Sequence, residues 1–339
     1  MLINRQYKSL SSIAIGVTVL GALRSLATEV AVEQSERGAV ITIDGGPFAE
    51  YLLKSGHQPV IWPIIGPDGQ AMTRQYPLGP ALPGEPADHP HHRSLWFNHG
   101  AVNDLDFWIV PNPRAAVQKD NLIVHREFAA LESRGRSALI VTRNDWISDA
   151  KKICEDTRTI EFGVDEHGRW IDYAIELHAS QGDLTFGDTD EGSFGIRVPG
   201  TMAVDAKRGG QILTSGGQRD LDAWGHVAQW VDYHGPVDGK AAGIVMFSLP
   251  DSFRHPCRWH VRTYGLFAAN PFGENGFPPA DLKQGVVKLA KGDALRLHYR
   301  VLFYSGERQA VDLEAINEDY VKTIDKSRCD DAKSLKKTD

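Results

Sequence analysis

The chain has 339 residues and a formal net charge of −7 at pH 7. This acidic balance argues against a nucleic acid or an anionic membrane as a partner, because both are bound through basic surfaces. A small neutral or polar ligand fits the composition better, and its chemical class has to come from the motifs along the chain.

The N-terminus has the features of a secretory signal peptide. Arg5 and Lys8 precede an uncharged stretch, residues 13–23, and Ala27 ends a small-x-small cleavage site. The apolar run is about 11 residues long, whereas a membrane-spanning helix needs roughly 20. The sequence therefore predicts a signal peptide at 1–27, no membrane span after its cleavage, and a periplasmic or extracellular location. An uncleaved anchor is the alternative.

The rest of the chain is predicted to form short strands separated by turns. Residues 30–54 alternate apolar and polar side chains around Gly45 and Gly46, which predicts a strand, a turn and a second strand. The tetrapeptide 165–168 predicts a hairpin turn between two further strands. Strand-like runs recur at 122–128, 137–143, 157–164, 170–179, 243–249 and 295–304.

Helical periodicity is scarce, and its best candidate lies at 312–324. The predicted fold class is all-β, an antiparallel β-sandwich or supersandwich of galactose-mutarotase-like type with few short helices. One domain is expected over 28–325, followed by a disordered charged tail at 326–339. The cysteines, Cys154, Cys257 and Cys329, are far apart in the sequence, so at most one disulfide is expected, with Cys154 and Cys257 as a pair to consider.

The densest polar segment is 76–100, in which five prolines restrict the backbone before a histidine cluster. We interpret it as one wall of a ligand site. Histidines hydrogen-bonded to the backbone of a tight turn are the structural alternative. A metal site built from His89, His91 and His99 is a third interpretation. The candidate catalytic residues here are His91 and His92, and the candidate substrate-binding residues are Arg93, Trp96, Asn98 and His99.

The second polar segment, 187–197, places carboxylates between glycines that let a ligand approach the backbone closely. Asp188 and Glu191 are predicted to be catalytic, because glycosidases, lyases and epimerases use carboxylates as acid or base. Asp190 belongs to the same run. An acidic turn and a calcium loop are the alternatives.

The third segment is 258–273. In an extended strand, His260, Arg262 and Tyr264 would share one face, and Asn270 would follow in the adjoining turn. We assign these residues to substrate binding, together with His57 from an earlier aromatic segment. A half-exposed strand with a salt bridge explains the pattern equally well.

Five blocks of the chain resemble the PmoA-like family of exported bacterial proteins, which carries the name of a methane oxygenase. The blocks are DHPHHRSLWFNHG (88–100), DFW (106–108), RTIEF (158–162), GDTDEGSFGIRV (187–198) and HVRTYGLFAANPFG (260–273). The resemblance implies a glycan-related role, through the family's association with bacterial carbohydrate-degradation genes. It supplies no catalytic residue. The oxygenase name conflicts with the sequence, because particulate methane oxygenase subunits are integral membrane proteins.

The leading interpretation is an exported enzyme acting on a carbohydrate, a hydrolase, lyase or epimerase for a glycoside or modified sugar. A non-catalytic carbohydrate-binding protein and a histidine-ligated metal-dependent oxidase or oxygenase are the alternatives. The sequence identifies no cofactor. The three polar segments are expected to form one pocket, because a single domain seldom supports three separate polar centres.

Overall fold

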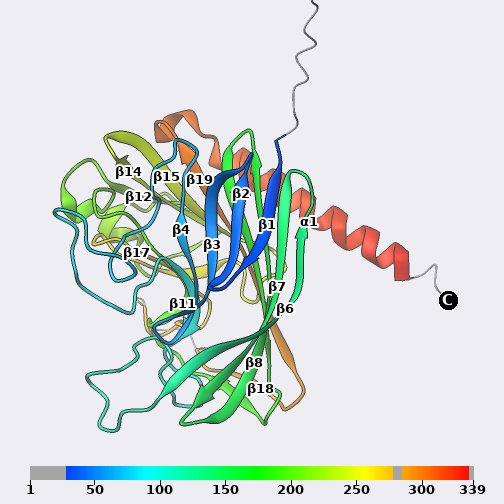
Figure 1. Cartoon of the computed structure of the whole chain (residues 1–339). Helices are drawn as coiled ribbons and strands as arrows, with labels where there is room; N and C mark the ends of the chain where they lie inside the picture. Colours follow the sequence, from blue (N-terminus) through cyan, green and yellow to red (C-terminus); the bar gives the residue numbers. More distant parts are fainter. Residues whose placement is uncertain (1–27, 278–284, 336–339) are drawn as a thin grey trace, which may run out of the picture.

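Antiparallel β-sheets make up most of the protein, as expected from the sequence (Figure 1). The computed structural model describes residues 28–277 and 285–335, with side chains as far as Ile324. The predicted signal peptide at 1–27 lies outside the described residues. No described helix is both long enough and apolar enough to cross a membrane.

The first sheet has nine strands and joins distant parts of the chain. Its central neighbours β5, β11, β17 and β16 come from three separate regions of the sequence, all paired antiparallel. In spatial order the strands are β1 (Val30–Ser35), β2 (Gly38–Ile43), β3 (Gly46–Ser55), β4 (Gln58–Ile64), β5 (Leu95–His99), β11 (Gly192–Arg197), β17 (Leu266–Asn270), β16 (Cys257–Val261) and β13 (Val227–Ala228).

The second sheet has eight strands, and a small two-stranded sheet pairs β10 (Leu184–Phe186) with β18 (Val287–Leu289). Short 3₁₀ helices occur at η1 (Val204–Ala206), η2 (Asp220–Ala223) and η3 (Arg308–Ala310). The strands of the second sheet are, in spatial order, β12 (Gln211–Thr214), β14 (Trp230–Val237), β15 (Lys240–Ser248), β19 (Ala294–Ser305), β9 (Gly168–His178), β8 (Lys151–Asp165), β7 (Ser137–Ser148) and β6 (Asn121–Ser133).

Local turn chemistry sets these hairpins. The Asp165 carboxylate accepts hydrogen bonds from the backbone N–H groups of His167 and Gly168, which confirms the predicted turn between β8 and β9. Between residues 30 and 54 the structure has three strands, where two were predicted. The extra turn ends at Gly38, whose φ of +152° brings its Cα against the Tyr51 backbone, where a Cβ would clash.

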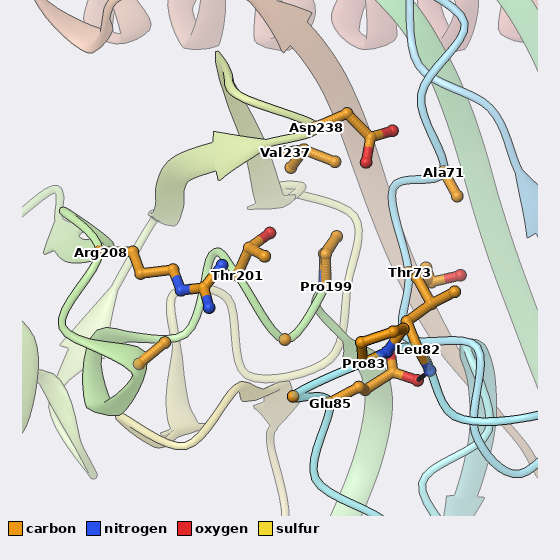
Figure 2. A pocket seen from close by; sticks show the side chains of 13 residues that line it. Ala71, Thr73, Leu82, Pro83, Glu85, Pro199, Thr201, Arg208, Val237 and Asp238 are labelled. Atoms are coloured by element: carbon orange, nitrogen blue, oxygen red, sulfur yellow. Dashed lines mark hydrogen bonds between the residues drawn. The ribbon is translucent and has the colours of Figure 1, made fainter.

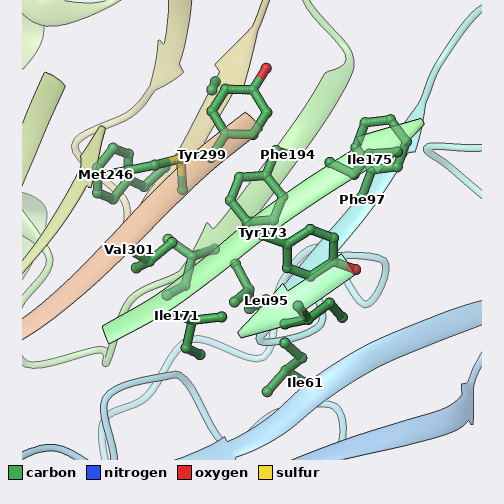
Figure 3. Packing of buried hydrophobic residues seen from close by; sticks show 14 of the residues in the cluster. Ile61, Leu95, Phe97, Ile171, Tyr173, Ile175, Phe194, Met246, Tyr299 and Val301 are labelled. Atoms are coloured by element: carbon green, nitrogen blue, oxygen red, sulfur yellow. The ribbon is translucent and has the colours of Figure 1, made fainter. Parts of the chain in front are cut away.

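The two large sheets face each other across one apolar core, drawn in Figure 3. Leu95, Phe97 and Phe194 project from the nine-stranded sheet, while Tyr173 and Tyr299 project from the eight-stranded sheet. The Phe194 ring lies 4.8 Å from the Tyr173 ring and 5.0 Å from the Tyr299 ring. Burying each such side chain contributes about 1.5–3 kcal/mol, so this core holds the sheets together.

A buried ion pair lies within the same core. Asp156 and Arg158 are both fully buried, and the Asp156 carboxylate accepts hydrogen bonds from the Arg158 guanidinium, Asn144 and the Trp146 indole. Arg158 Nη2 in turn donates to the carbonyl of Phe97, at 3.4 Å, on β5 of the opposite sheet. This pair therefore connects the eight-stranded sheet to the strand that follows the histidine cluster.

The C-terminal helix α1 (Leu313–Leu335) lies against the outer face of the eight-stranded sheet and then projects away from it (Figure 1). Leu313, Ile316 and Tyr320 pack on Trp230 and its apolar neighbours. The prediction of a disordered tail from residue 326 is wrong as far as Leu335, where the chain is helical. That stretch lacks Gly and Pro, the residues that most strongly end a helix. Residues 336–339 lie outside the described residues.

Cys154 and Cys257 are both buried and free, so the structure has no disulfide between them. Each serves as a small apolar residue of the core.

The buried ion pair generates a stability prediction. Asp156→Asn leaves the Arg158 guanidinium buried without an anionic partner, and we expect the free energy of unfolding to fall by about 3–5 kcal/mol. Denaturant unfolding of the two proteins measures this difference. Glu132→Gln, which breaks the exposed pair of Glu132 with Arg134, is the control and should change stability by less than about 1 kcal/mol. Equal effects of the two substitutions would contradict the role assigned to Asp156.

Candidate functional site

The three polar segments meet at one cavity of about 190 Å³. The cavity is on the face of the nine-stranded sheet that points away from the core. Phe97 and Phe194 face the core. Trp96, which precedes Phe97 in β5, and Ala268, which pairs with Gly195 from β17, belong to a separate outer cluster on the opposite face. Each segment contributes lining residues. The cavity is lined by His89, His91, His92, Ile109, Arg114, Asp190, Glu191, His260, Arg262 and Tyr264.

A turn, and not a continuous strand, brings the third segment to the cavity. β16 ends at Val261, and the Gly265 N–H donates to the Arg262 carbonyl at 3.0 Å. The expectation that His260, Arg262 and Tyr264 share one strand face is therefore wrong in its geometry. They still line the same cavity, His260 from the strand and the other two from the turn before β17.

His89 and His92 stack with Trp96 and Tyr264 as nearly parallel rings, whereas His91 is edge-on to both histidines, at 71° and 75°. His92 stacks on Trp96 at 5.5 Å, His89 stacks on His92 at 4.8 Å, and Tyr264 stacks on His89 at 5.1 Å. Trp96 lies flat because the facing residue is Gly195, where a Cβ would come within 2.8 Å of the indole. These stacked rings give the cavity a rigid wall.

The Asp88 carboxylate holds this wall in place. It accepts hydrogen bonds from Arg74 at 2.5 Å and Arg197 at 2.8 Å, and His89 Nδ1 lies 3.2 Å away. Both arginine side chains are only 1% exposed, so two cations are buried against one anion. Asp88 itself is 38% exposed, and water can reach part of its carboxylate.

Arg74 also fixes the proline-rich segment. Its guanidinium donates to the carbonyl oxygens of Tyr76, Pro86, His89 and His92, at 3.0–3.3 Å. One side chain thus satisfies the backbone acceptors of a loop that belongs to neither sheet. His89 and Ser94 adopt positive φ angles of 43° and 58°, a conformation that the surrounding contacts must maintain.

Hydrogen bonding defines the tautomers of two cavity histidines. Arg197 Nη1 lies 3.2 Å from His92 Nδ1, and since a guanidinium can only donate, the proton of neutral His92 is on Nε2. His260 Nδ1 lies 2.5 Å from the Asp190 carbonyl oxygen, which can only accept, so His260 carries its proton on Nδ1 and keeps a lone pair on Nε2. His92 is therefore a donor and His260 an acceptor.

Burial keeps these imidazoles neutral. It lowers the pKa of His260 to about 4 and the pKa of His91 to about 3, and it holds the pKa of His92 well below its ordinary value. A neutral imidazole can donate one hydrogen bond and accept another without adding positive charge to the cavity.

Glu191 has the opposite shift. Burial raises the pKa of its carboxyl to about 7, and the negative charges of Asp190 and Asp106 add to this, while Arg114 and Arg262 oppose it. The carboxyl therefore exchanges its proton near neutral pH, which is the property expected of a general acid or base.

The structure places Asp188 away from the cavity. Its carboxylate accepts hydrogen bonds from the backbone N–H groups of Asn275 and Gly276 and from the Asn275 side chain. Asp190 and Glu191, in the bend just before β11, line the cavity instead. The expectation of a catalytic role for Asp188 is therefore not supported by its position.

Several predicted substrate-binding residues have structural contacts and do not line the cavity. His99 is enclosed between the Gly187 carbonyl and the Ser193 hydroxyl, and Asn270 caps the turn at Phe272 and Gly273. His99 is thus separated from His89 and His91, which removes the predicted metal triad. Among the described residues, no three His, Cys, Asp or Glu side chains are grouped so that they could hold a metal ion.

The remaining four lie beneath or beside the wall. His57 and Asn98 both bond to the carbonyl of Phe107, at 2.9 and 2.6 Å. Arg93 donates to Ser55. Trp96 supports His92 from below and is itself buried. Of the four, Trp96 contacts the ring wall directly, through its stacking on His92.

Sequence reasoning did not single out Ile109 and Arg114. Both come from the irregular segment between β5 and β6, beyond the DFW block at 106–108, where no hydrophobic periodicity indicates a site. Asp190 was placed in the acidic run but not assigned a role, because the direction of each side chain in a turn cannot be read from the sequence.

A second hollow, of about 180 Å³, is lined in part by the proline-rich segment, through Leu82, Pro83 and Glu85 (Figure 2). Glu85 lines it, but its carboxylate already accepts hydrogen bonds from the backbone N–H groups of Gln75, Tyr76 and Leu82. Figure 2 shows Arg208 and Asp238 as its other charged residues, far fewer titratable groups than the histidine cavity has. Because the histidine cavity brings all three polar segments together, we assign the functional site to it.

Comparison with known proteins gives a family and a fold. A family model described as "Family of unknown function (DUF6807)" matches residues 38–318, which is most of the chain. No curated protein matches the sequence.

Several solved structures are similar in fold. The galactosidase domain of an alpha-galactosidase-sucrose kinase, AgaSK, has a TM-score of 0.41 at 8% identity, over 81% of this chain and 42% of that one. A Glycoside Hydrolase Family 97 enzyme from Pseudoalteromonas sp. strain K8 has a TM-score of 0.32 at 10% identity, over 83% and 34%. A galactose mutarotase-like protein from Lactobacillus casei ATCC 334 has a TM-score of 0.31 at 12% identity, over 81% and 97%. The chain spans less than half the length of the first two, and these likenesses concern the fold alone.

The Asp88 cluster generates a prediction about loop order. Asp88→Asn leaves the guanidiniums of Arg74 and Arg197 buried without an anion, and we expect a loss of about 1–3 kcal/mol in stability, reduced by the partial exposure of Asp88. Hydrogen exchange of residues 85–94 should accelerate more than exchange in the sheets. Asp68→Asn, in an exposed turn, is the control. Unchanged exchange in 85–94 would show that Asp88 does not hold the loop.

Proposed function

We propose that this chain, which belongs to the family of unknown function DUF6807, is an enzyme that binds a carbohydrate in the histidine cavity and transfers protons to and from it. The observation that carries the proposal is a carboxyl group titrating near neutral pH, Glu191, in the same cavity as a neutral imidazole with a free lone pair, His260. Such a pair can supply an acid and a base at one ligand.

The walls of the cavity suit a sugar. The C–H face of a pyranose ring is apolar and its hydroxyls alternate as donors and acceptors, so a sugar site combines aromatic rings with fixed polar groups. The cavity offers the Tyr264 ring beside the stacked histidines, the Nε2–H donor of His92 and the acceptor of His260. The Arg262 guanidinium adds charge-assisted donors.

In this proposal Glu191 donates its proton to a glycosidic, ring or leaving oxygen, and His260 Nε2 accepts a proton from a hydroxyl, a carbon or a water molecule. Hydrolysis, elimination and epimerisation all consist of such paired transfers, and the identity of the product separates them. His92 and Arg262 bind oxygens that gain negative charge during the reaction.

The cellular location forms part of the proposal. The basic residues and apolar run at 1–27 favour export to the periplasm or outside the cell, where a glycan-directed enzyme would meet its substrate.

Glu191→Gln tests the catalytic role. Glutamine keeps the size and polarity of the side chain but cannot release a proton, so we expect turnover to fall by about 10²–10⁴-fold. The assay follows product formation by NMR over a panel of oligosaccharides, glycosides and uronic acids. Glu166→Gln, at an exposed turn, should leave turnover unchanged. Full activity of Glu191→Gln would remove Glu191 from the mechanism, whereas sugar binding without any turnover in the natural protein would favour a non-catalytic binding protein.

The pH profile is a separate prediction. The active form needs His260 neutral, which holds above its pKa of about 4, and Glu191 protonated, which holds below its pKa of about 7. We therefore expect kcat/KM to rise through about pH 4, remain level, and fall through about pH 7. Initial rates measured between pH 3 and 9 give the profile, within the range where the protein stays folded. A kcat/KM that increases above pH 7 would show that Glu191 acts in its ionised form.

A further inference from the structure

Two guanidinium groups line the histidine cavity without forming an ion pair with a described residue. Within the described part of the chain, neither Arg262 nor Arg114 forms an ion pair or donates a side-chain hydrogen bond. By contrast, the arginines behind the cavity wall, Arg74 and Arg197, are both bound to Asp88. An unpaired cation that lines a cavity is available to bind an anionic group of a ligand.

The Arg262 side chain is held in place before any ligand binds. Its guanidinium carbon lies 5.1 Å from the centre of the Trp224 ring and 5.8 Å from the centre of the Tyr264 ring. Its backbone is fixed on both sides of the turn, because the Arg262 N–H donates to Leu266 and the Arg262 carbonyl accepts from Gly265. A positioned guanidinium loses little conformational entropy when it binds a ligand.

Arg262 also lines a second space, a hollow of about 260 Å³ lined further by Leu221, Trp224, Val261 and Thr263. Of the described residues that line this hollow, Arg262 alone is charged. The Arg262 side chain is therefore shared by the histidine cavity and this hollow.

The charges around the cavity favour an anion, although the whole chain has a net charge of −7. Of the described residues that line the cavity, Arg262 and Arg114 are cationic, and Asp190 and Glu191 are acidic. When Glu191 holds its proton, as the proposed function requires, the two lining guanidiniums face the single charge of Asp190.

We propose that the substrate is an acidic sugar, a uronic acid or its glycoside, whose carboxylate is bound by Arg262, with Arg114 completing the binding site at the cavity mouth. This inference rests on the proposed function and specifies its substrate class. The planar fork of a guanidinium matches a carboxylate in two parallel hydrogen bonds. A neutral sugar would leave the guanidinium without its anion.

The same contact connects binding to the proton transfer. In the free protein Arg262 opposes the rise in the pKa of the Glu191 carboxyl. A bound carboxylate offsets this positive charge and adds a negative one nearby, so the pKa of Glu191 rises when a uronate binds. Glu191 then holds its proton to a higher pH in the complex than in the free protein.

The experiment compares sugars that differ only at carbon 6, using the full chain. Binding of galacturonate against galactose, and of glucuronate against glucose, is measured by isothermal titration calorimetry at low salt. We expect the uronate of the favoured pair to bind at least about 10-fold tighter, and high salt to reduce this ratio. Galactose 6-phosphate and glucose 6-phosphate are included to distinguish a carboxylate from a phosphate.

Variants assign the effect to Arg262. In Arg262→Gln the ratio of uronate to neutral sugar affinity should fall to within about 3-fold of unity. Arg262→Lys keeps the positive charge but loses the planar guanidinium, so its ratio should lie between that of the natural protein and that of Arg262→Gln. Arg37→Gln, at a largely exposed arginine, is the matched control and should keep the full ratio. Thermal melts of each variant establish that it is folded, and Arg262→Lys provides the test if Arg262→Gln is not.

The outcomes separate the two proposals. Equal binding of uronates and neutral sugars overturns the acidic-sugar inference and leaves the proposed function standing. Tighter binding of the sugar phosphates overturns the carboxylate assignment, and a uronate preference that survives in both Arg262 variants overturns the role of Arg262. If no sugar of either kind binds, the proposed function and this inference fail together.

Discussion

One carboxylate, that of Asp88, holds the candidate site together. It is the anion shared by Arg74 and Arg197, two guanidiniums buried beside the outer face of the nine-stranded sheet. Arg74 binds the carbonyls of the loop that carries the histidines, and Arg197 sets the tautomer of His92. Without Asp88 these two cations would repel each other in a poorly solvated environment. The ring wall, the donor on His92 and the shape of the cavity all depend on this interaction.

The candidate site also depends on the sheet topology, which makes distant segments of the chain neighbours. β5 pairs with β11, β11 with β17, and β17 with β16, so four strands from three regions of the chain lie side by side. The histidine segment before β5 and the Arg262 turn before β17 lie at one end of these strands, and the acidic segment before β11 enters from the opposite end. The inward faces of the same strands belong to the core, which fixes the sheet while its outer face presents polar groups.

Sequence patterns were sufficient for the fold class and for locating the polar segments. Alternating apolar residues report which strands have one buried face, and the density of histidines and carboxylates showed where polar groups are concentrated. The direction of single side chains was not predictable, because it depends on turns and on partners distant in sequence. Asp188 binds the 275–276 backbone, His99 lies inside the sheet, and Arg114 comes from a segment without any pattern. The helix beyond residue 326 was missed because its charge resembles that of a disordered tail.

We propose that residues from three distant segments act on one sugar molecule. A crystal structure of the protein soaked with a galacturonate or glucuronate glycoside tests this directly. We expect electron density for the sugar in the histidine cavity, with its carboxylate bound to Arg262 and contacts to both Glu191 and His260. A sugar bound elsewhere on the protein, or in the cavity but in contact with one of the three segments only, would contradict it.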